Sequence, residues 1–260
     1  MRVAVEGIEV AWYEVGRGRP VVLVHGLADD HRAWRKVLPH LVLDHRVILY
    51  DLRGHGETAL GAADGSLRQL DADLVGLLDA IGVERAVIAG FSLGGTVAMR
   101  VGIDHPDRVD GLALIATSSR VNAAAAQWYR ARAAAVDGGD PDLRWRLDLD
   151  TEDVYRNDPG ELGAGLVIRR QSTADPRGYA NACRAMADLH EHPLDDELGH
   201  VSAPTVVVAG DLDQHCPPRA GEIIARLIAQ STLRVVPATG HPIPVEQPAE
   251  VADAIRVLER

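Results

Sequence analysis

The chain has 260 residues, of which 47% are hydrophobic and 25% charged, as in an ordinary globular protein rather than a disordered or membrane-spanning one. Its formal net charge is −11, and it has no basic run. We therefore expect neither nucleic acid nor an anionic membrane as a partner, because both need clustered Lys and Arg. Cys183 and Cys216 are too few for a disulfide framework. With no export signal in residues 1–7 and no apolar run of about 20 residues, a soluble, cytoplasmic protein is expected.

Short apolar runs indicate the strands of a sheet. Residues 3–5 and 10–15, on either side of Glu6-Gly7, predict an antiparallel hairpin at the sheet edge. Runs rich in Val and Ile follow at residues 21–24, 47–50, 86–89, 112–115, 206–209 and 233–236. Most lack polar alternation and are separated by helix-length segments, which favours a parallel sheet covered on both faces. The fold class predicted is therefore α/β, with a mostly parallel, doubly wound sheet.

Two segments between these runs have the apolar spacing of helices that pack on a sheet. The first stripe consists of Leu67, Leu70, Leu74, Leu77, Leu78 and Ile81, and the second of Ile223, Ile224, Leu227 and Ile228. From residue 118 to 200 the strand rhythm stops, and Ala- and Arg-rich helical segments replace it. We interpret residues 118–200 as a helical cap inserted into a core of residues 1–117 and 201–260.

A glycine-rich motif follows the strand predicted at residues 86–89 and opens a helical segment. It reads Gly90-Phe91-Ser92-Leu93-Gly94-Gly95. A serine at such a turn is held in a strained backbone conformation, which requires small residues two before and two after it. The helix N-terminus beneath Ser92 directs free N–H groups, that of Leu93 among them, at an oxyanion formed there. Ser92 is therefore the candidate nucleophile.

A serine hydroxyl needs a base to remove its proton and a carboxylate to orient that base. Two loops after late strands offer both. Asp211 and Asp213 follow the strand at residues 206–209, and His241 follows the strand at residues 233–236. Because open α/β sheets place ligands at the carboxyl ends of their strands, we expect these loops to converge on Ser92. Residue chemistry alone leaves Asp211 and Asp213 as alternatives.

Five blocks in order resemble the α/β-hydrolase superfamily: Val24-His25-Gly26-Leu27, Asp51-Leu52-Arg53-Gly54-His55-Gly56, the Ser92 motif, Gly210-Asp211-Leu212-Asp213 and Gly240-His241. The resemblance implies an α/β-hydrolase fold with Ser92, Asp213 and His241 as catalytic triad. It leaves Asp211 as a turn residue and places the oxyanion hole at the N–H groups of Leu27 and Leu93. Residues 175–185 and 240–248 also resemble 3-oxoadipate enol-lactonases and related esterases.

Other residues have simpler interpretations. His25 and His55 are expected to tie loops together, and His190, His192 and His200 fit no metal-ligand spacing, so no metal is predicted. The cap arginines indicate a solvated face, although one of them could bind a substrate carboxylate. Pro242 restricts the backbone of His241. Four aromatic residues are candidates for lining a pocket: Trp34, Trp128, Trp145 and Tyr179.

These expectations define a hydrolase that needs no cofactor and cleaves a small carboxylic ester or lactone through an acyl-enzyme on Ser92. The same triad could instead act on a C–C bond beside a carbonyl, on a thioester, or in perhydrolysis. A ligand sensor or non-hydrolytic biosynthetic protein is a further alternative, because function does not follow from fold. The sequence predicts a small-molecule substrate but leaves its identity and the oligomeric state open.

Overall fold

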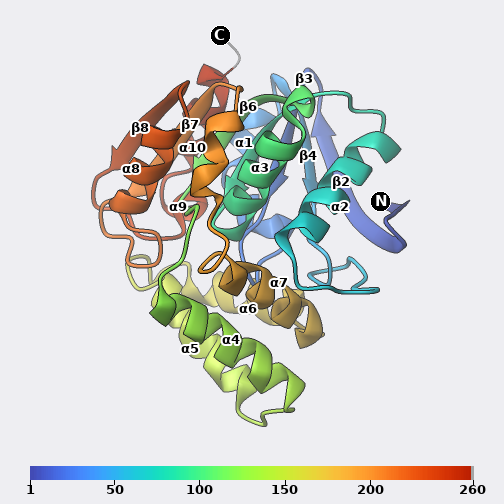
Figure 1. Cartoon of the computed structure of the whole chain (residues 1–260), viewed down its shortest axis with the longest axis vertical. Helices are drawn as coiled ribbons and strands as arrows, with labels where there is room; N and C mark the ends of the chain where they lie inside the picture. The colour runs from blue at the N-terminus through green and yellow to red at the C-terminus, as the bar shows by residue number, and fades with distance from the viewer. Residues whose placement is uncertain (259–260) are drawn as a thin grey trace.

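An eight-stranded sheet forms the centre of the structure, with strand order β1-β2-β4-β3-β5-β6-β7-β8 (Figure 1). The computed structural model describes residues 1–258. The strands are β1 (Arg2–Val5), β2 (Ile8–Gly16), β3 (Arg19–Val24), β4 (His45–Tyr50), β5 (Ala86–Phe91), β6 (Val109–Ile115), β7 (Thr205–Gly210) and β8 (Ser231–Val236). The pairs β1–β2 and β2–β4 are antiparallel, and the remaining pairs are parallel. The mostly parallel sheet is confirmed.

The predicted hairpin is present at the edge of the sheet, where β1 pairs with β2 and Val5 lies opposite Ile8. Glu6 and Gly7 form the two-residue turn with φ angles of 45° and 76°. Two consecutive positive φ angles match the right-handed twist of the flanking strands, which is why such turns favour Gly.

Helices cover both faces of the sheet. Successive side chains of β3 alternate between two buried clusters: Val22 and Val24 belong to one, and Val21 and Leu23 to the other. The first cluster includes residues of α2 (Leu67–Ala80), α3 (Leu93–Asp104) and α8 (Pro218–Leu227). The second includes residues of α1 (Leu38–Leu41) and α10 (Pro248–Val257). Because both faces are buried, the central strands carry unbroken apolar runs.

The helix α2 illustrates how the sequence specifies an element. Ser66 caps it by accepting a hydrogen bond from the Gln69 backbone N–H at 3.1 Å. The predicted leucine stripe is buried from Leu67 to Leu78, whereas Ile81 lies just past the helix end and is partly exposed.

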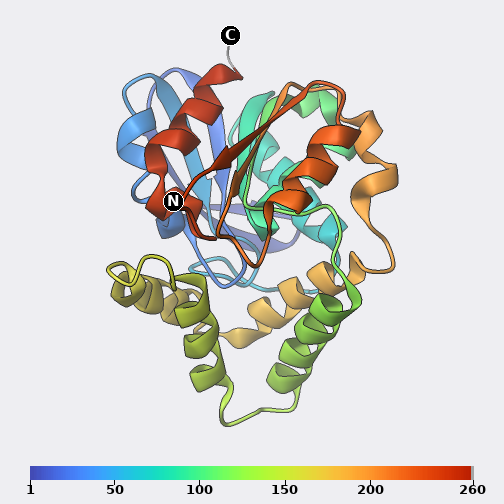
Figure 2. The same ribbon diagram turned by 90° about the vertical axis from the view of Figure 1, so that its left-hand side faces the viewer.

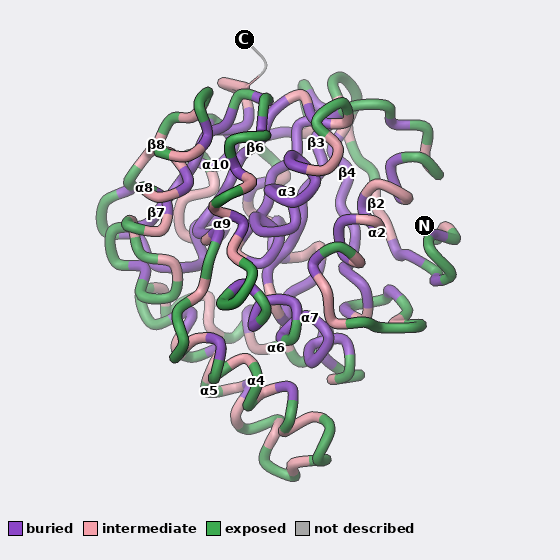
Figure 3. The backbone as a smooth tube through the Cα atoms, viewed as in Figure 1, coloured by how far each residue is buried: buried purple, intermediate pink, exposed green. Residues whose placement is uncertain are grey.

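Between β6 and β7 the chain leaves the sheet and forms four helices, which lie together below the sheet in Figures 1 and 2. They are α4 (Ala123–Asp137), α5 (Leu143–Val154), α6 (Leu162–Ser172) and α7 (Pro176–Asp188). Figure 3 shows that α4 and α5 are largely exposed or intermediate, in contrast to the buried strands. We refer to these four helices as the cap; the division of the chain into a core and a cap of residues 118–200 stays a prediction.

Short helical turns complete the fold: η1 (His31–Trp34), η2 (Pro106–Arg108), η3 (Leu194–Asp196), η4 (Leu198–His200) and α9 (Ile243–Glu246). Within residues 1–258, no helix combines the length and apolarity needed to cross a membrane.

Candidate active site

Ser92 stands at a sharp turn between β5 and α3. Its φ of 53° and ψ of −119° are unusual for a residue with a side chain. A Cβ on Gly90 would lie 2.2 Å from the carbonyl oxygen of Gly94, and one on Gly94 would lie 2.1 Å from that of Val24. Both positions therefore require glycine, which explains the spacing of the motif.

Hydrogen bonds with β6 and with the residues just after it hold this turn in place. The Ser92 N–H donates to Ile115 O at 2.9 Å, and Thr117 Oγ1 donates to Ser92 O at 2.7 Å. A non-glycine residue with such a backbone costs about 1–3 kcal/mol. The surrounding bonds compensate that strain and fix the direction of the Ser92 side chain.

The three side chains predicted to act together form one row of hydrogen bonds. His241 Nε2 lies 3.2 Å from Ser92 Oγ, and His241 Nδ1 lies 2.8 Å from Asp213 Oδ2. Ser92 follows β5, Asp213 follows β7 and the loop of His241 follows β8. Since these strands are parallel, their carboxyl ends lie at one edge of the sheet and bring the three loops together.

Asp213 is placed to hold one tautomer of His241. Its Oδ1 accepts hydrogen bonds from the backbone N–H groups of His215 at 2.8 Å and Cys216 at 3.0 Å. Burial alone would raise the pKa of Asp213, but the adjacent His241 and these hydrogen bonds lower it below the usual value. An ionised Asp213 accepts a hydrogen bond from the Nδ1–H of His241, which leaves Nε2 free to accept a proton from Ser92.

Asp211, the alternative acid, has a different partner. Its Oδ1 accepts a hydrogen bond from the Thr239 backbone N–H at 3.1 Å, which joins the loops after β7 and β8. The structure therefore brings Asp213, and not Asp211, to His241.

Two backbone N–H groups lie beside Ser92. Leu93 begins α3, and Leu27 follows Gly26, where a Cβ would lie 3.3 Å from the Cβ of Ser92. Among the described residues, neither N–H has a hydrogen-bond acceptor. Free N–H groups at a helix start and in an adjacent loop can stabilise an oxyanion that forms on a substrate of Ser92.

His25 and His55 are buried beside each other, with ring centroids 5.5 Å apart. His25 Nε2 accepts a hydrogen bond from the Leu52 N–H at 2.9 Å, and its Nδ1 donates to Gly26 O at 2.8 Å. His25 thus connects the loops that follow β3 and β4. Burial, followed by the influence of His25, lowers the pKa of His55 to about 4, so His55 is neutral at neutral pH.

The cap attaches to the loops at the carboxyl edge of the sheet. Ser172 of α6 donates a hydrogen bond to Asp29 O, and its own carbonyl accepts one from the Gly56 N–H at 3.1 Å. In α7, Gly178 lies so close to Gly54 that a Cβ would be 1.9 Å from the Gly54 carbonyl oxygen. The cap therefore covers the edge at which Ser92 and His241 lie.

The four aromatic residues predicted to line a pocket are not brought together. Trp34 is fully buried in the core cluster that contains α1 and α10. Trp128 and Trp145 lie on the cap surface, 38% and 59% exposed. Tyr179 is buried in a cluster that joins Ala28 of the core to residues of the cap. Of the four, Tyr179 is thus the one packed against the loop of Leu27, and the pocket role of all four stays a prediction.

Two residues near the site, His215 and Arg169, were not singled out individually from the sequence. His215 has its ring centroid 4.9 Å from that of His241, and its Nε2 lies 3.1 Å from Asp153 Oδ2 of the cap. The cap residue Arg169 lies against Asp29, two residues beyond Leu27. For His215, its position two residues after Asp213 was a usable signal, whereas nothing in the sequence distinguished Arg169 from its neighbours.

Asp30, His31 and Asp51 have ligand atoms within 4.8 Å of one another, as a metal site would require. However, Asp51 Oδ1 accepts from both the ring Nδ1 and the backbone N–H of His31, at 2.7 and 2.9 Å. Arg32 Nε donates to Asp30 at 2.9 Å. These groups satisfy one another, so their arrangement has a structural explanation.

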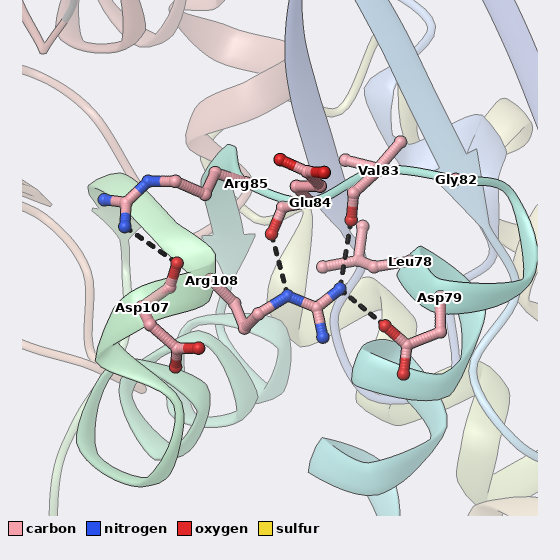
Figure 4. A pocket seen from close by; sticks show the side chains of 8 residues that line it. All are labelled: Leu78, Asp79, Gly82, Val83, Glu84, Arg85, Asp107 and Arg108. Atoms are coloured by element: carbon pink, nitrogen blue, oxygen red, sulfur yellow. Dashed lines mark hydrogen bonds and ion pairs between the residues drawn. The ribbon is translucent and has the colours of Figure 1, made fainter.

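A hollow of about 490 Å³ lies away from the candidate site, near the amino ends of β5 and β6. Figure 4 shows the side chains that line it: Leu78, Asp79, Gly82, Val83, Glu84, Arg85, Asp107 and Arg108. Arg108 bonds to the carbonyls of Glu84 and Val83 and pairs with Asp79. Its charged group is therefore satisfied by the walls of the hollow, which contain no nucleophile paired with a base.

Comparison with known proteins supports the fold class. Residues 19–248 match the family described as alpha/beta hydrolase fold. The chain is 32% identical over 241 residues to 3-oxoadipate enol-lactonase 1 of Acinetobacter baylyi, covering 88% of this chain and 84% of the relative. A thermophilic esterase from Thermogutta terrifontis, solved with malate bound, has a TM-score of 0.86 and 33% identity over 100% of this chain and 98% of that one.

The enol-lactonase from Burkholderia xenovorans LB400 superimposes with a TM-score of 0.88 at 24% identity, covering 100% of this chain and 99% of that one. The family match spans most of the chain and includes the loops of Ser92, Asp213 and His241. The chain belongs to the α/β hydrolase family.

Proposed function

We propose that the protein is a serine hydrolase that cleaves small carboxylic esters or lactones. The observation that carries this proposal is the continuous row of hydrogen bonds from Ser92 through His241 to Asp213. The identity of 32% to a protein named an enol-lactonase, and of 33% to one described as an esterase, supports the class of bond.

The proposed reaction has two halves. In the first, His241 Nε2 takes the Ser92 proton while Oγ attacks the substrate carbonyl, and the N–H groups of Leu27 and Leu93 stabilise the oxyanion. The leaving alkoxide takes the proton from His241, which leaves an acyl group on Ser92. In the second half, His241 deprotonates a water that attacks the acyl carbon, and Ser92 regains its proton as the carboxylic acid departs.

The test is hydrolysis of a panel of chromogenic esters and lactones, together with fluorophosphonate labelling located by mass spectrometry. We expect labelling at Ser92 and loss of turnover by several orders of magnitude in Ser92→Ala. Ser202→Ala is the matched control, because Ser202 is exposed before β7. Thioesters, C–C substrates and peroxide as acceptor in the same panel test the other reactions open to this triad.

Absence of labelling, with turnover no faster in the wild type than in Ser92→Ala, would refute the hydrolase. It would favour a ligand sensor or a non-hydrolytic protein with the same fold.

A further inference from the structure

Arginines are numerous in the cap, and almost all of them have partners within residues 118–200 or the adjacent core. Carboxylates, or in one case a threonine, pair with Arg120, Arg130, Arg132, Arg144, Arg146, Arg156, Arg170, Arg177 and Arg184. Arg169 differs: among the described residues, none accepts a hydrogen bond from its guanidinium. A guanidinium carries five N–H donors, so this group has unused capacity.

This unpaired guanidinium is largely buried at the boundary between cap and core. The Arg169 side chain is 12% exposed, and its Nε is inaccessible to solvent and has no partner. It lies one turn before Ser172 in α6, the residue that donates to Asp29 O. Arg169 is therefore held against Asp29, two residues beyond Leu27 in the loop after β3.

Asp29 does not satisfy Arg169. Asp29 Oδ1 lies 3.6 Å from Nη1, which is beyond hydrogen-bond distance. Burial raises the pKa of Asp29 above its usual value, and the opposing influence of Arg169, the next largest, does not cancel that effect. The contact thus leaves Nε and Nη2 without acceptors, although buried donors are nearly always paired in native proteins.

We propose that Arg169 binds a free carboxylate of the substrate through its Nε and Nη2 edge. This inference rests on the proposed function and narrows it to esters or lactones that also carry a carboxylate. The side-on edge of a guanidinium matches the two oxygens of a carboxylate and forms two parallel hydrogen bonds with it. Asp29 lies on the Nη1 side, so among the described residues no acceptor is bonded to the Nε and Nη2 edge.

The charge balance of the site favours a group with a single negative charge. A dianionic phosphate would bring two charges close to Asp29, whereas a carboxylate brings one. A second carboxylate on the same guanidinium would also favour protonation of Asp29, because like charges raise a carboxyl pKa. Asp29 and the substrate carboxylate could then share Arg169 without facing each other as two anions.

The test compares each carboxylate with a neutral analogue of the same shape. The substrates are monoethyl succinate, glutarate and adipate, and the same esters with the free carboxylate replaced by a carboxamide, followed in a pH-stat. The variants are Arg169→Gln, Arg169→Lys and, as the matched control, Arg170→Gln. Arg170 is the next residue of α6 and already bonds to Asp148 at 2.9 Å through two nitrogens.

For at least one chain length, we expect the wild type to prefer the carboxylate. Arg169→Gln should lower kcat/KM for that ester about 30-fold, mainly through KM, because hydrogen bonds to a charged group are lost. The carboxamide rate should change less than threefold. Arg169→Lys should retain part of the preference, and Arg170→Gln should retain all of it. Glutarate should inhibit carboxamide hydrolysis in the wild type more strongly than in Arg169→Gln.

An equal loss on carboxylate and carboxamide in both Arg169 variants would overturn the proposal and make Arg169 a structural partner of Asp29. Ser92-dependent turnover without any preference for the carboxylate would overturn it as well, while leaving the hydrolase intact. No Ser92-dependent turnover of any ester in the panel would refute the proposed function itself, and the carboxylate site with it.

Discussion

Asp213→Asn changes the candidate site by a single group and keeps its shape. Asp213 Oδ1 accepts from the backbone N–H groups of His215 and Cys216, so the amide oxygen should stay there and the NH₂ group should face His241 Nδ1. Two donors cannot pair. His241 must then accept at Nδ1 and carry its proton on Nε2, where it no longer accepts the proton of Ser92.

The free energy lost when the Asp213 charge is removed follows from the distance between Asp213 Oδ2 and His241 Nδ1. Two unit charges 2.8 Å apart attract by about 6 kcal/mol at an effective dielectric constant of about 20. His241 becomes charged only as Ser92 loses its proton, so this attraction acts in the transition state and not before it. At about 1.4 kcal/mol for each factor of ten, we expect kcat to fall about 10⁴-fold with little change in KM.

The assay is steady-state hydrolysis of the best ester from the panel, with circular dichroism to show that the variant is folded. Asp211→Asn is the matched control, because Asp211 lies in the same loop but bonds to the Thr239 N–H. We expect that variant to keep activity within about tenfold, since it leaves the charge beside His241 unchanged. If Asp211→Asn lost as much as Asp213→Asn, or if the latter kept a tenth of the activity, the assignment of the acid would be wrong.

Three further predictions concern the cap, a buried ion pair and a buried histidine. Gly178→Ala should destabilise the protein by about 1–3 kcal/mol in thermal unfolding, because the added Cβ would clash with the backbone of Gly54. Gly163→Ala, where the added Cβ has open space, should stabilise it by about 0.5–1 kcal/mol. Equal effects of the two variants would contradict the close packing of Gly178 on Gly54. Arg53→Gln should cost about 3–5 kcal/mol in urea unfolding, because it leaves Asp73 buried and uncompensated, and Asp73→Asn added to it should recover part of that loss. The pKa of His55 is about 4 in the folded protein and about 6.5 in the unfolded chain, so the free energy of unfolding should fall as the pH is lowered from 6.5 to 4. His55→Gln should reduce that fall by about 3 kcal/mol. An unchanged dependence of the free energy of unfolding on pH would show that His55 does not cause it.

The strands of the core were predictable because the pattern that specifies each of them lies within a few consecutive residues. Buried parallel strands need unbroken apolar runs, and the positions of β5, β6 and β7 could be derived from Val- and Ile-rich segments alone. The turn at Ser92 was equally predictable, since Gly90 and Gly94 are fixed by contacts a few residues apart or with an adjacent strand.

The surroundings of the site were not predictable, because they depend on how the cap lies on the core. Trp34 belongs to the four-residue helix η1, which is too short to show an apolar period, and its side chain turns into the core. Arg169 is adjacent to Arg170 in the sequence, yet one is largely buried over Asp29 and the other pairs with Asp148 in solvent. Composition does not separate two neighbouring arginines that have different surroundings on one helix.

The cap departs from β6 and returns to β7, and these two strands are hydrogen-bonded neighbours in the sheet. An evolutionary change in the length or sequence of the cap would therefore leave the register of the sheet intact. Ser92, Asp213 and His241 all lie outside the cap, so the proposed catalytic groups would survive such a change. Descendants of a common ancestor could in this way diverge in what they bind while inheriting the same chemistry.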